Sequence, residues 1–214
     1  SLSDAVDLLD ETLGPDHPDT LTSRNNLANA YQSAGRLNQA IDLFEQAVAD
    51  RERVLGPDHP DTLASRNNLA NAYESAGRLK QAIPLLEQVL ADSERVLGPD
   101  HPYTLTSRNN LAAAYESAGR LEQAIDLFEQ TLTDSKRVLG SDHPHTLTLR
   151  GNLAHAYESA GRVSEAIPLF EQVLADSERI LGPDHPDTLT SRNNLAHAYW
   201  SVSRFDDAIP LFER

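Results

Sequence analysis

The chain has 214 residues, of which 39% are hydrophobic and 24% are charged, and its formal net charge is −15. Nucleic acids and anionic lipid surfaces require a basic footprint, so this charge argues against both as partners and favours neutral or basic ligands. The absence of cysteine excludes disulfides, thiolate metal sites and a cysteine nucleophile, and no apolar run approaches the roughly 20 residues of a membrane span.

The first residues have the spacing of an amphipathic helix, with Val6, Leu9 and Leu13 on one side. They resemble the second half of the later repeats but, in that alignment, lack seven residues before Gly14. We therefore expect residues 1–14 to be a partial second helix. No export signal is visible, and we expect a cytoplasmic protein, although a chain that begins at Ser1 can have lost such a signal.

The motif Gly14-Pro15-Asp16-His17-Pro18-Asp19 contains a helix stop and a helix start. Glycine can adopt the left-handed conformation that ends a helix, and proline cannot continue it. His17 is the expected N-cap, because it precedes a proline at the first helical position. The pattern predicts a first helix, A, from about residue 18 to residue 34, ended by Gly35.

A second helix, B, is predicted from about residue 37 to residue 55, with Ile41 and Phe44 on its apolar side and Gly56 at its end. Helices A and B, joined by a tight turn, predict an antiparallel hairpin. One position of helix B alternates between proline and aspartate, which indicates an exposed site near the helix start. Its residues are Asp42, Pro84, Asp126, Pro168 and Pro210.

The stretch from Asn25 to Tyr31 recurs through the chain, and its closing tyrosines, Tyr31, Tyr73, Tyr115, Tyr157 and Tyr199, are 42 residues apart. A fixed period of this length is typical of a solenoid, whose units bury their apolar faces by stacking on their neighbours. We expect one solenoid over residues 1–214. Its predicted repeats are 15–56, 57–98, 99–140, 141–182 and a truncated 183–214, preceded by the partial helix 1–14.

The residues Leu27-Ala28, Tyr31, Ala40, Phe44 and Ala47 resemble a tetratricopeptide repeat. The 42-residue period, the long helix B and the Leu-Gly-Pro-Asp-His-Pro connector are most similar to the variant found in kinesin light chains and in bacterial signalling proteins. The resemblance implies an all-α, right-handed α-solenoid of tandem helical hairpins. It also implies a protein-interaction scaffold that is not an enzyme.

One departure from the family pattern is an arginine three residues before the Leu-Ala pair, where the family has a large apolar residue. A buried guanidinium requires a carboxylate, and we expect a partner of the Glu45 or Asp50 class. The arginines are Arg24, Arg66, Arg108, Arg150 and Arg192.

Helix A carries a polar face opposite its apolar side, and in the resembled family this face lines a concave groove. Stacked repeats would align its asparagines in three files, and amides can bind the backbone of an extended peptide. Some of these asparagines could instead hold the next repeat or cap backbone groups. The files are Asn25, Asn67, Asn109 and Asn193; Asn26, Asn68, Asn110, Asn152 and Asn194; and Asn29 and Asn71.

The files change in the C-terminal half, where Gly151 and Ala113 replace asparagines and His155, His197 and Trp200 appear on the same face. These changes are either the source of side-chain preference or drift in a redundant repeat.

We expect no metal, cofactor or catalytic residue. Asp142, His143 and His145 form the one dense cluster of possible ligands, and His155 and His197 form the one groove pair, but neither has a third ligand at suitable spacing. Phosphate loops, nucleophile elbows and zinc-protease motifs are absent.

The predicted function is a scaffold that binds a neutral to basic peptide or partner segment in the asparagine-lined groove. Two alternatives stay open: self-assembly through the solenoid ends, and a sensor arm of a larger nucleotide-binding signalling ATPase. The short last helix leaves apolar residues such as Phe205 with little cover, so we expect either a fragment or a homo-oligomer.

Overall fold

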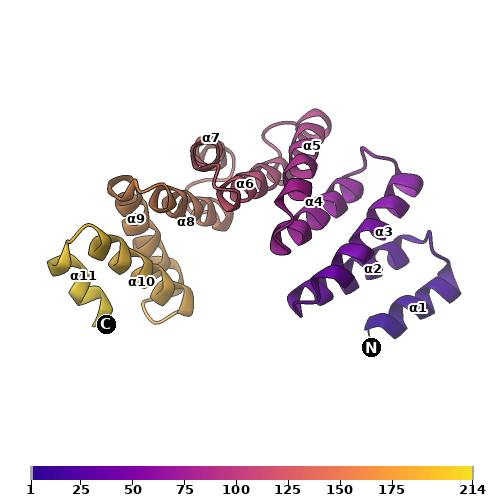
Figure 1. Ribbon diagram of the computed structural model, residues 1–214, viewed down its shortest axis with the longest axis horizontal. Coiled ribbons are helices and arrows are strands. Elements are labelled where there is room, and N and C mark those ends of the chain that lie inside the picture. Colours follow the sequence, from indigo (N-terminus) through magenta and orange to yellow (C-terminus); the bar gives the residue numbers. More distant parts are fainter. Residues whose placement is uncertain (1, 214) are drawn as a thin grey trace. The chain divides into compact units, whose positions relative to one another are not determined.

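The computed structural model describes residues 2–213, without the side chains of residues 2, 3, 5 and 7. The chain divides into two compact units, residues 1–114 and 115–214, and each is described by itself. The described residues form helices and no strand, arranged as consecutive hairpins (Figure 1), so the expected all-α fold class of tandem helical hairpins is confirmed.

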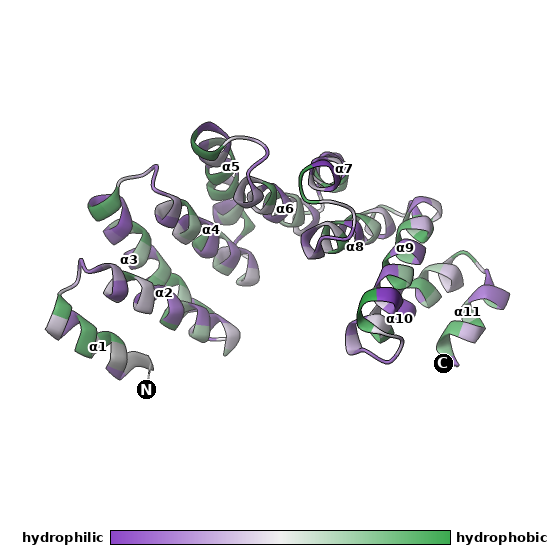
Figure 2. Ribbon diagram, turned by 180° about the vertical axis from the view of Figure 1, so that it is seen from behind, coloured by the Kyte–Doolittle hydropathy of each residue, from purple (hydrophilic) through white to green (hydrophobic). Residues whose placement is uncertain are grey.

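The A helices are α2 (Pro18–Ser33), α4 (Pro60–Ser75), α6 (Pro102–Ser117), α8 (Pro144–Ser159) and α10 (Pro186–Ser201). The B helices are α1 (Leu2–Leu13), α3 (Leu37–Leu55), α5 (Leu79–Leu97), α7 (Leu121–Val138), α9 (Val163–Leu181) and α11 (Phe205–Phe212). Apolar and polar residues interleave along the helices (Figure 2), and none of those described is long and apolar enough to cross a membrane.

Each A helix begins as the sequence predicts. His17 is the N-cap of α2, and its imidazole Nδ1 accepts a hydrogen bond from the backbone N–H of Asp19 at 3.2 Å. This bond satisfies one of the amides left open at a helix start. The imidazoles of His59, His101, His143 and His185 accept the equivalent bond.

The glycine that ends helix B has the predicted positive φ, but its backbone is not the expected left-handed helical one. Gly56 has φ 90° and ψ 163°, and Gly98 has φ 92° and ψ 158°. This region is accessible almost only to glycine.

We predict that Gly98→Ala lowers the free energy of unfolding by about 1 kcal/mol or more, because alanine resists this backbone conformation. No atom lies within 4 Å of a Cβ added at Gly98, so the cost would be conformational and not steric. Urea denaturation followed by circular dichroism measures the change. An unaltered midpoint would show that the turn adjusts to a side chain without strain.

The cores lie between the A and B helices of each unit. In the first unit, Ala28 of α2, Phe44 of α3, Leu69 of α4 and Ala82 of α5 belong to one buried cluster. In the second unit, Phe128 and Phe170 are almost completely buried. The alternating proline and aspartate position of helix B is exposed in every copy, as expected, so the proline lies outside these cores.

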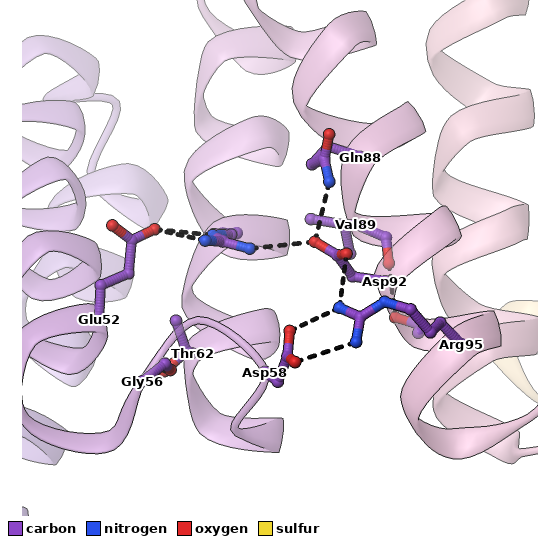
Figure 3. Close-up of polar contacts among 10 residues, drawn as sticks. Glu52, Gly56, Asp58, Thr62, Gln88, Val89, Asp92 and Arg95 are labelled. Carbon is purple, nitrogen blue, oxygen red and sulfur yellow. Dashed lines mark hydrogen bonds and ion pairs between the residues drawn. The ribbon is translucent and has the colours of Figure 1, made fainter.

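The arginines of the A helices are bonded to carboxylates of the B helices, and Arg24 and Arg66 each bond two different B helices. Arg66 of α4 lies 2.7 Å from Glu52 of α3 and 3.2 Å from Asp92 of α5. Figure 3 shows one guanidinium between these two carboxylates, with Gln88 and Arg95 also bonded to Asp92. Similar pairs join Arg24 to Asp10 and Asp50, Arg108 to Glu94, Arg150 to Asp176, and Arg192 to Glu178.

The expected Asp50 class is therefore confirmed as a partner of the arginine, but the Glu45 class is wrong. Glu45 of α3 instead accepts a hydrogen bond from the Tyr73 hydroxyl of α4 at 2.6 Å. Glu45 lies 28 residues before Tyr73 in the sequence, and its carboxylate bonds the first helix of the next hairpin. In the second unit, Tyr157 donates to Glu129, and Tyr199 donates to Glu171.

The same pairing corrects the alignment of α1. Asp10 lies 14 residues before Arg24 and bonds it, as Glu52 lies 14 residues before Arg66 and bonds it. Residues 2–13 thus correspond to residues 44–55 without a gap. The proposed seven-residue deletion was wrong, because the guanidinium fixes the helix at the normal repeat spacing.

We predict that the tyrosine–glutamate bonds make the protein lose stability between about pH 10 and pH 12. Burial, followed by the bond to Glu45 and the charge of Glu45, raises the pKa of Tyr73 to about 12, whereas an unfolded tyrosine titrates near 10. The raised pKa means that this stabilisation is complete below pH 10 and disappears as the pH rises through 12.

Tyr73→Phe keeps the ring beside Arg78 but removes the ionisable group. The variant should be less stable than the parent by about 1 kcal/mol at neutral pH, and this difference should shrink towards pH 12. Urea titrations at several pH values measure it. A difference that stays constant up to pH 12 would contradict the prediction.

Candidate functional site

The predicted groove residues differ in their exposure. In the first file, Asn67 is only 6% exposed, Asn25 and Asn109 are half-buried, and Asn193 is exposed. In the third file, Asn29 is exposed and Asn71 is half-buried. In the second file, Asn26 is exposed, and Asn68, Asn110, Asn152 and Asn194 are half-buried.

Several of these amides bond to one another between adjacent repeats. The Asn68 amide donates to the Oδ1 of Asn25 at 3.4 Å, and the Asn110 amide donates to the Oδ1 of Asn67 at 3.2 Å. Asn109 also donates to Asn110 at 3.3 Å. The second file therefore joins neighbouring A helices, as its structural alternative supposes. A side-chain amide has two N–H donors and two oxygen lone pairs, so an asparagine that makes one of these bonds can still bond a ligand.

The histidine and tryptophan substitutions lie against the aromatic residues of the B helices. The rings of His155 and Phe170 pack edge-on, with their centroids 5.0 Å apart. The Nδ1 of His155 lies 3.6 Å from the Glu158 carboxylate, and its Nε2 lies 3.3 Å from the Asn194 amide. These contacts suit the tautomer that carries its proton on Nδ1 and accepts at Nε2.

His197 and Trp200 form a separate group at α10 and α11. The ring centroids of His197 and Phe212 lie 5.2 Å apart, and those of Trp200 and Phe205 lie 4.8 Å apart, both in an edge-on arrangement. Trp200 is 54% exposed. The structure thus brings His155 together with Asn194, and His197 together with Trp200 through Phe212.

A cavity of about 460 Å³ lies beside Gly151, between α8, α9 and the first turn of α10. Asn152 and His155, which belong to the predicted groove face, line one part of it together with Thr148. Apolar residues of both helices also line it, and Asp142 and Asp187 supply carboxylates. The apolar lining residues are Leu147, Val173, Ile180 and Leu181.

The sequence pattern did not point to the apolar lining residues or to Asp187, and Asp142 was considered only as a possible metal ligand. Gly151 was expected only to remove one asparagine from the first file, although removing a side chain also opens space. Nothing lies within 4 Å of a Cβ added at Gly151. The glycine was therefore a visible signal of a cavity, but its walls come from three helices that sequence spacing alone does not bring together.

No metal site emerges from the described residues: they contain no group of three histidine or acidic side chains placed to hold an ion. In the predicted dense cluster, His143 uses its Nδ1 to accept the N–H of His145 at the start of α8. Burial lowers the pKa of His145, and the nearby His143 lowers it further.

Comparison with known proteins agrees with this architecture. The family model described as tetratricopeptide repeat matches residues 1–53, 25–94, 77–136, 119–177 and 146–214. The chain is 45% identical over 49 residues to Protein KINESIN LIGHT CHAIN-RELATED 2 of Arabidopsis thaliana, a match that covers 23% of this chain and 7% of that protein. The chain thus spans only a small part of this relative.

Two solved structures are similar over nearly the whole chain. A Podospora anserina kinesin light chain with nearly identical TPR-like repeats is 39% identical, with 92% of this chain and 93% of that chain covered and a TM-score of 0.80. BtubC (BKLC) from P. vanneervenii shares the fold at 22% identity, with 100% and 86% covered and a TM-score of 0.83. The chain therefore belongs to the tetratricopeptide repeat family, and its repeats are of the kinesin-light-chain-like kind.

Proposed function

We propose that the chain is a protein-interaction scaffold that binds an extended, neutral to basic segment of a partner along the polar face of its A helices. Tetratricopeptide repeat proteins generally mediate protein–protein interaction. Kinesin-light-chain-like repeats form a non-enzymatic scaffold fold, and we propose no reaction for this chain. The observation that carries the proposal is the set of uncharged amides on α2, α4, α6, α8 and α10.

The charge distribution supports a neutral to basic ligand. The arginines of the A helices, such as Arg66 and Arg192, are engaged by carboxylates of the chain itself. They are therefore poor partners for an acidic ligand, since such a ligand would have to displace a bonded carboxylate. The net charge of −15 adds a long-range attraction for basic segments.

The affinity should come from several weak contacts. A hydrogen bond between an amide and a peptide backbone contributes about 0.5–1.5 kcal/mol, so a few of them correspond to a dissociation constant in the micromolar range. Salt should weaken the binding only modestly, because amides carry no charge.

Asn67 is a poor probe of this function, because replacing it would also remove the acceptor for Asn110. Asn29 and Asn71 are better placed, since they are not in these amide pairs. We expect Asn29→Ala with Asn71→Ala to weaken binding of an extended library peptide about tenfold or more, which corresponds to about 1.4 kcal/mol. Fluorescence anisotropy with neutral, basic and acidic ten-residue libraries measures this change.

The matched control removes two amides from B helices, through Asn38→Ala and Gln172→Ala, both at exposed positions. It should bind like the parent protein. Equal losses of affinity in the groove variant and in the control would show that the binding site does not lie on the A helices. Preferential binding of the acidic library would contradict the proposed charge preference.

Self-association is the second candidate function, because an apolar surface is exposed on α10 and α11. Trp200, Phe205, Ile209 and Phe212 are between 43% and 54% exposed, and exposed apolar patches are typical of interaction surfaces. Sedimentation at increasing concentration should show an oligomer that Phe205→Ser weakens and Val96→Ser does not. A monomer at all concentrations would exclude this candidate. The sensor-arm alternative stays a prediction.

A further inference from the structure

We propose that the cavity beside Gly151 binds an arginine side chain of the partner segment. This inference rests on the proposed function and names one side chain of the ligand. The first repeat supplies the reason, because a cavity at the equivalent position there is partly filled by an arginine of the chain itself.

The two cavities have corresponding walls. Pro18, Leu21, Thr22 and Leu55 line the first one, and the residues 126 positions later, Pro144, Leu147, Thr148 and Leu181, line the second. Arg51 also lines the first cavity, which has a volume of about 230 Å³. The equivalent residue of the second cavity is Ser177, and the volume there is about 460 Å³.

Arg51 shows which groups hold a guanidinium at this position. It is only 7% exposed, and its Nη1 donates to the backbone oxygen of Asp61 at 3.1 Å and to the Ser65 hydroxyl at 2.6 Å. The equivalent acceptors in the second unit are the backbone oxygen of Asp187 and the hydroxyl of Ser191. These two groups already lie together, since the Ser191 hydroxyl donates to that oxygen at 2.9 Å.

Two short residues leave the second cavity open. Ser177 stands where the first repeat has Arg51, and Gly151 stands where the first two repeats have Asn25 and Asn67. Both short residues line the second cavity. Asp187 lines it as Asp61 lines the first cavity, and its carboxylate side chain is 77% exposed.

The apolar walls of the second cavity and its polar groups suit arginine better than lysine or an apolar residue. Leu147, Val173 and Leu181 can cover an aliphatic stem. The guanidinium of an arginine has five N–H donors in a planar fork, which fits several acceptors at once, whereas lysine has a compact ammonium. Arg179 does not oppose a second cation strongly, because it is bonded to Asp142 at 2.8 Å and to Asp176 at 3.1 Å.

The experiment compares two extended ten-residue peptides of Ala, Ser and Asn that differ only at the centre, where one has arginine and the other has citrulline. Citrulline keeps the stem and loses the charge. For the parent protein we expect the arginine peptide to bind about tenfold more tightly by fluorescence anisotropy. The methyl NMR signals of Leu147, Val173 and Leu181 should shift with the arginine peptide.

Two variants should remove the preference for arginine. Ser177→Arg places an internal guanidinium as in the first repeat, and Gly151→Asn restores the missing side chain in a helical position with open space around it. Ser177→Ala is the matched control and should keep the preference. Circular dichroism checks that each variant remains helical.

Equal binding of the two peptides to the parent, or an unchanged ratio in both blocking variants, would overturn the arginine pocket. If both peptides bind equally and the Asn29 and Asn71 changes weaken both, the groove function stands and only the pocket is wrong. If neither peptide binds but Ac-Ala-Arg-Ala-NH2 shifts the pocket methyl signals and its citrulline analogue does not, the pocket stands and the extended-segment function is wrong.

Discussion

Asp92→Ala should lower the free energy of unfolding by about 3 kcal/mol, because it leaves a largely buried guanidinium without one of its carboxylates. The side chains of Asp92 and Arg66 are 13% and 14% exposed, and they lie 3.2 Å apart. Asp92 also accepts hydrogen bonds from Gln88 and Arg95 (Figure 3). A single substitution therefore disrupts contacts between α4 and α5 and within α5.

The pH dependence of this effect has a defined sign. Burial alone would raise the pKa of Asp92, but the bonds from Gln88 and Arg95 and the charges of Arg95 and Arg66 outweigh it and hold the pKa below its ordinary value. A lowered pKa in the folded state gives stability that is present above the pKa of an unfolded aspartate, near 3.9, and is lost as the pH falls through the folded value. The difference between Asp92→Ala and the parent should therefore shrink at strongly acidic pH.

The matched control is Asp58→Ala. Asp58 bonds the same Arg95, but its side chain is 54% exposed, so solvent and salt screen the interaction. Urea denaturation at neutral pH should give a much smaller change than for Asp92→Ala. Equal changes in the two variants would show that burial of the guanidinium is not what makes the contact strong.

Phe44→Ala should lower the stability of the first unit by about 4 kcal/mol, because it leaves a cavity in a closely packed core. Phe44 is completely buried among residues of α2, α4 and α5. In an array of repeats, each hairpin is stabilised chiefly by its nearest neighbours. We therefore expect amide hydrogen exchange to accelerate in α2–α4 and to change little in α8–α10.

Phe170→Ala is the converse experiment, because Phe170 is 1% exposed in the second unit. It should accelerate exchange in α8–α10 and leave α2–α4 protected. Uniform acceleration along the chain in both variants would mean that the protein unfolds in one cooperative step. Phe205→Ala, at a position 43% exposed, should have a far smaller effect than either.

The sequence alone determined the helices and the fold class. The bounds of α2 and α3 follow from His17 with Pro18, from Gly35 and from Gly56, since caps and glycine or proline breaks act within one turn of the chain. The period of the tyrosines then predicted that these hairpins follow one another in tandem. These signals are local or strictly repeated, so no knowledge of distant contacts was needed.

Only the tertiary structure decided which side chains meet across the hairpins. Glu52 and Asp92 bond Arg66, whereas Glu45 bonds Tyr73. Glu45 and Glu52 lie on the same helix, α3, and sequence spacing does not reveal which of them meets which side chain of α4. The structure also showed that Asn67 is buried and that the space beside Gly151 is open. Burial depends on the bulk of all the surrounding side chains together, and in a nearly identical repeat a few short residues are enough to change it.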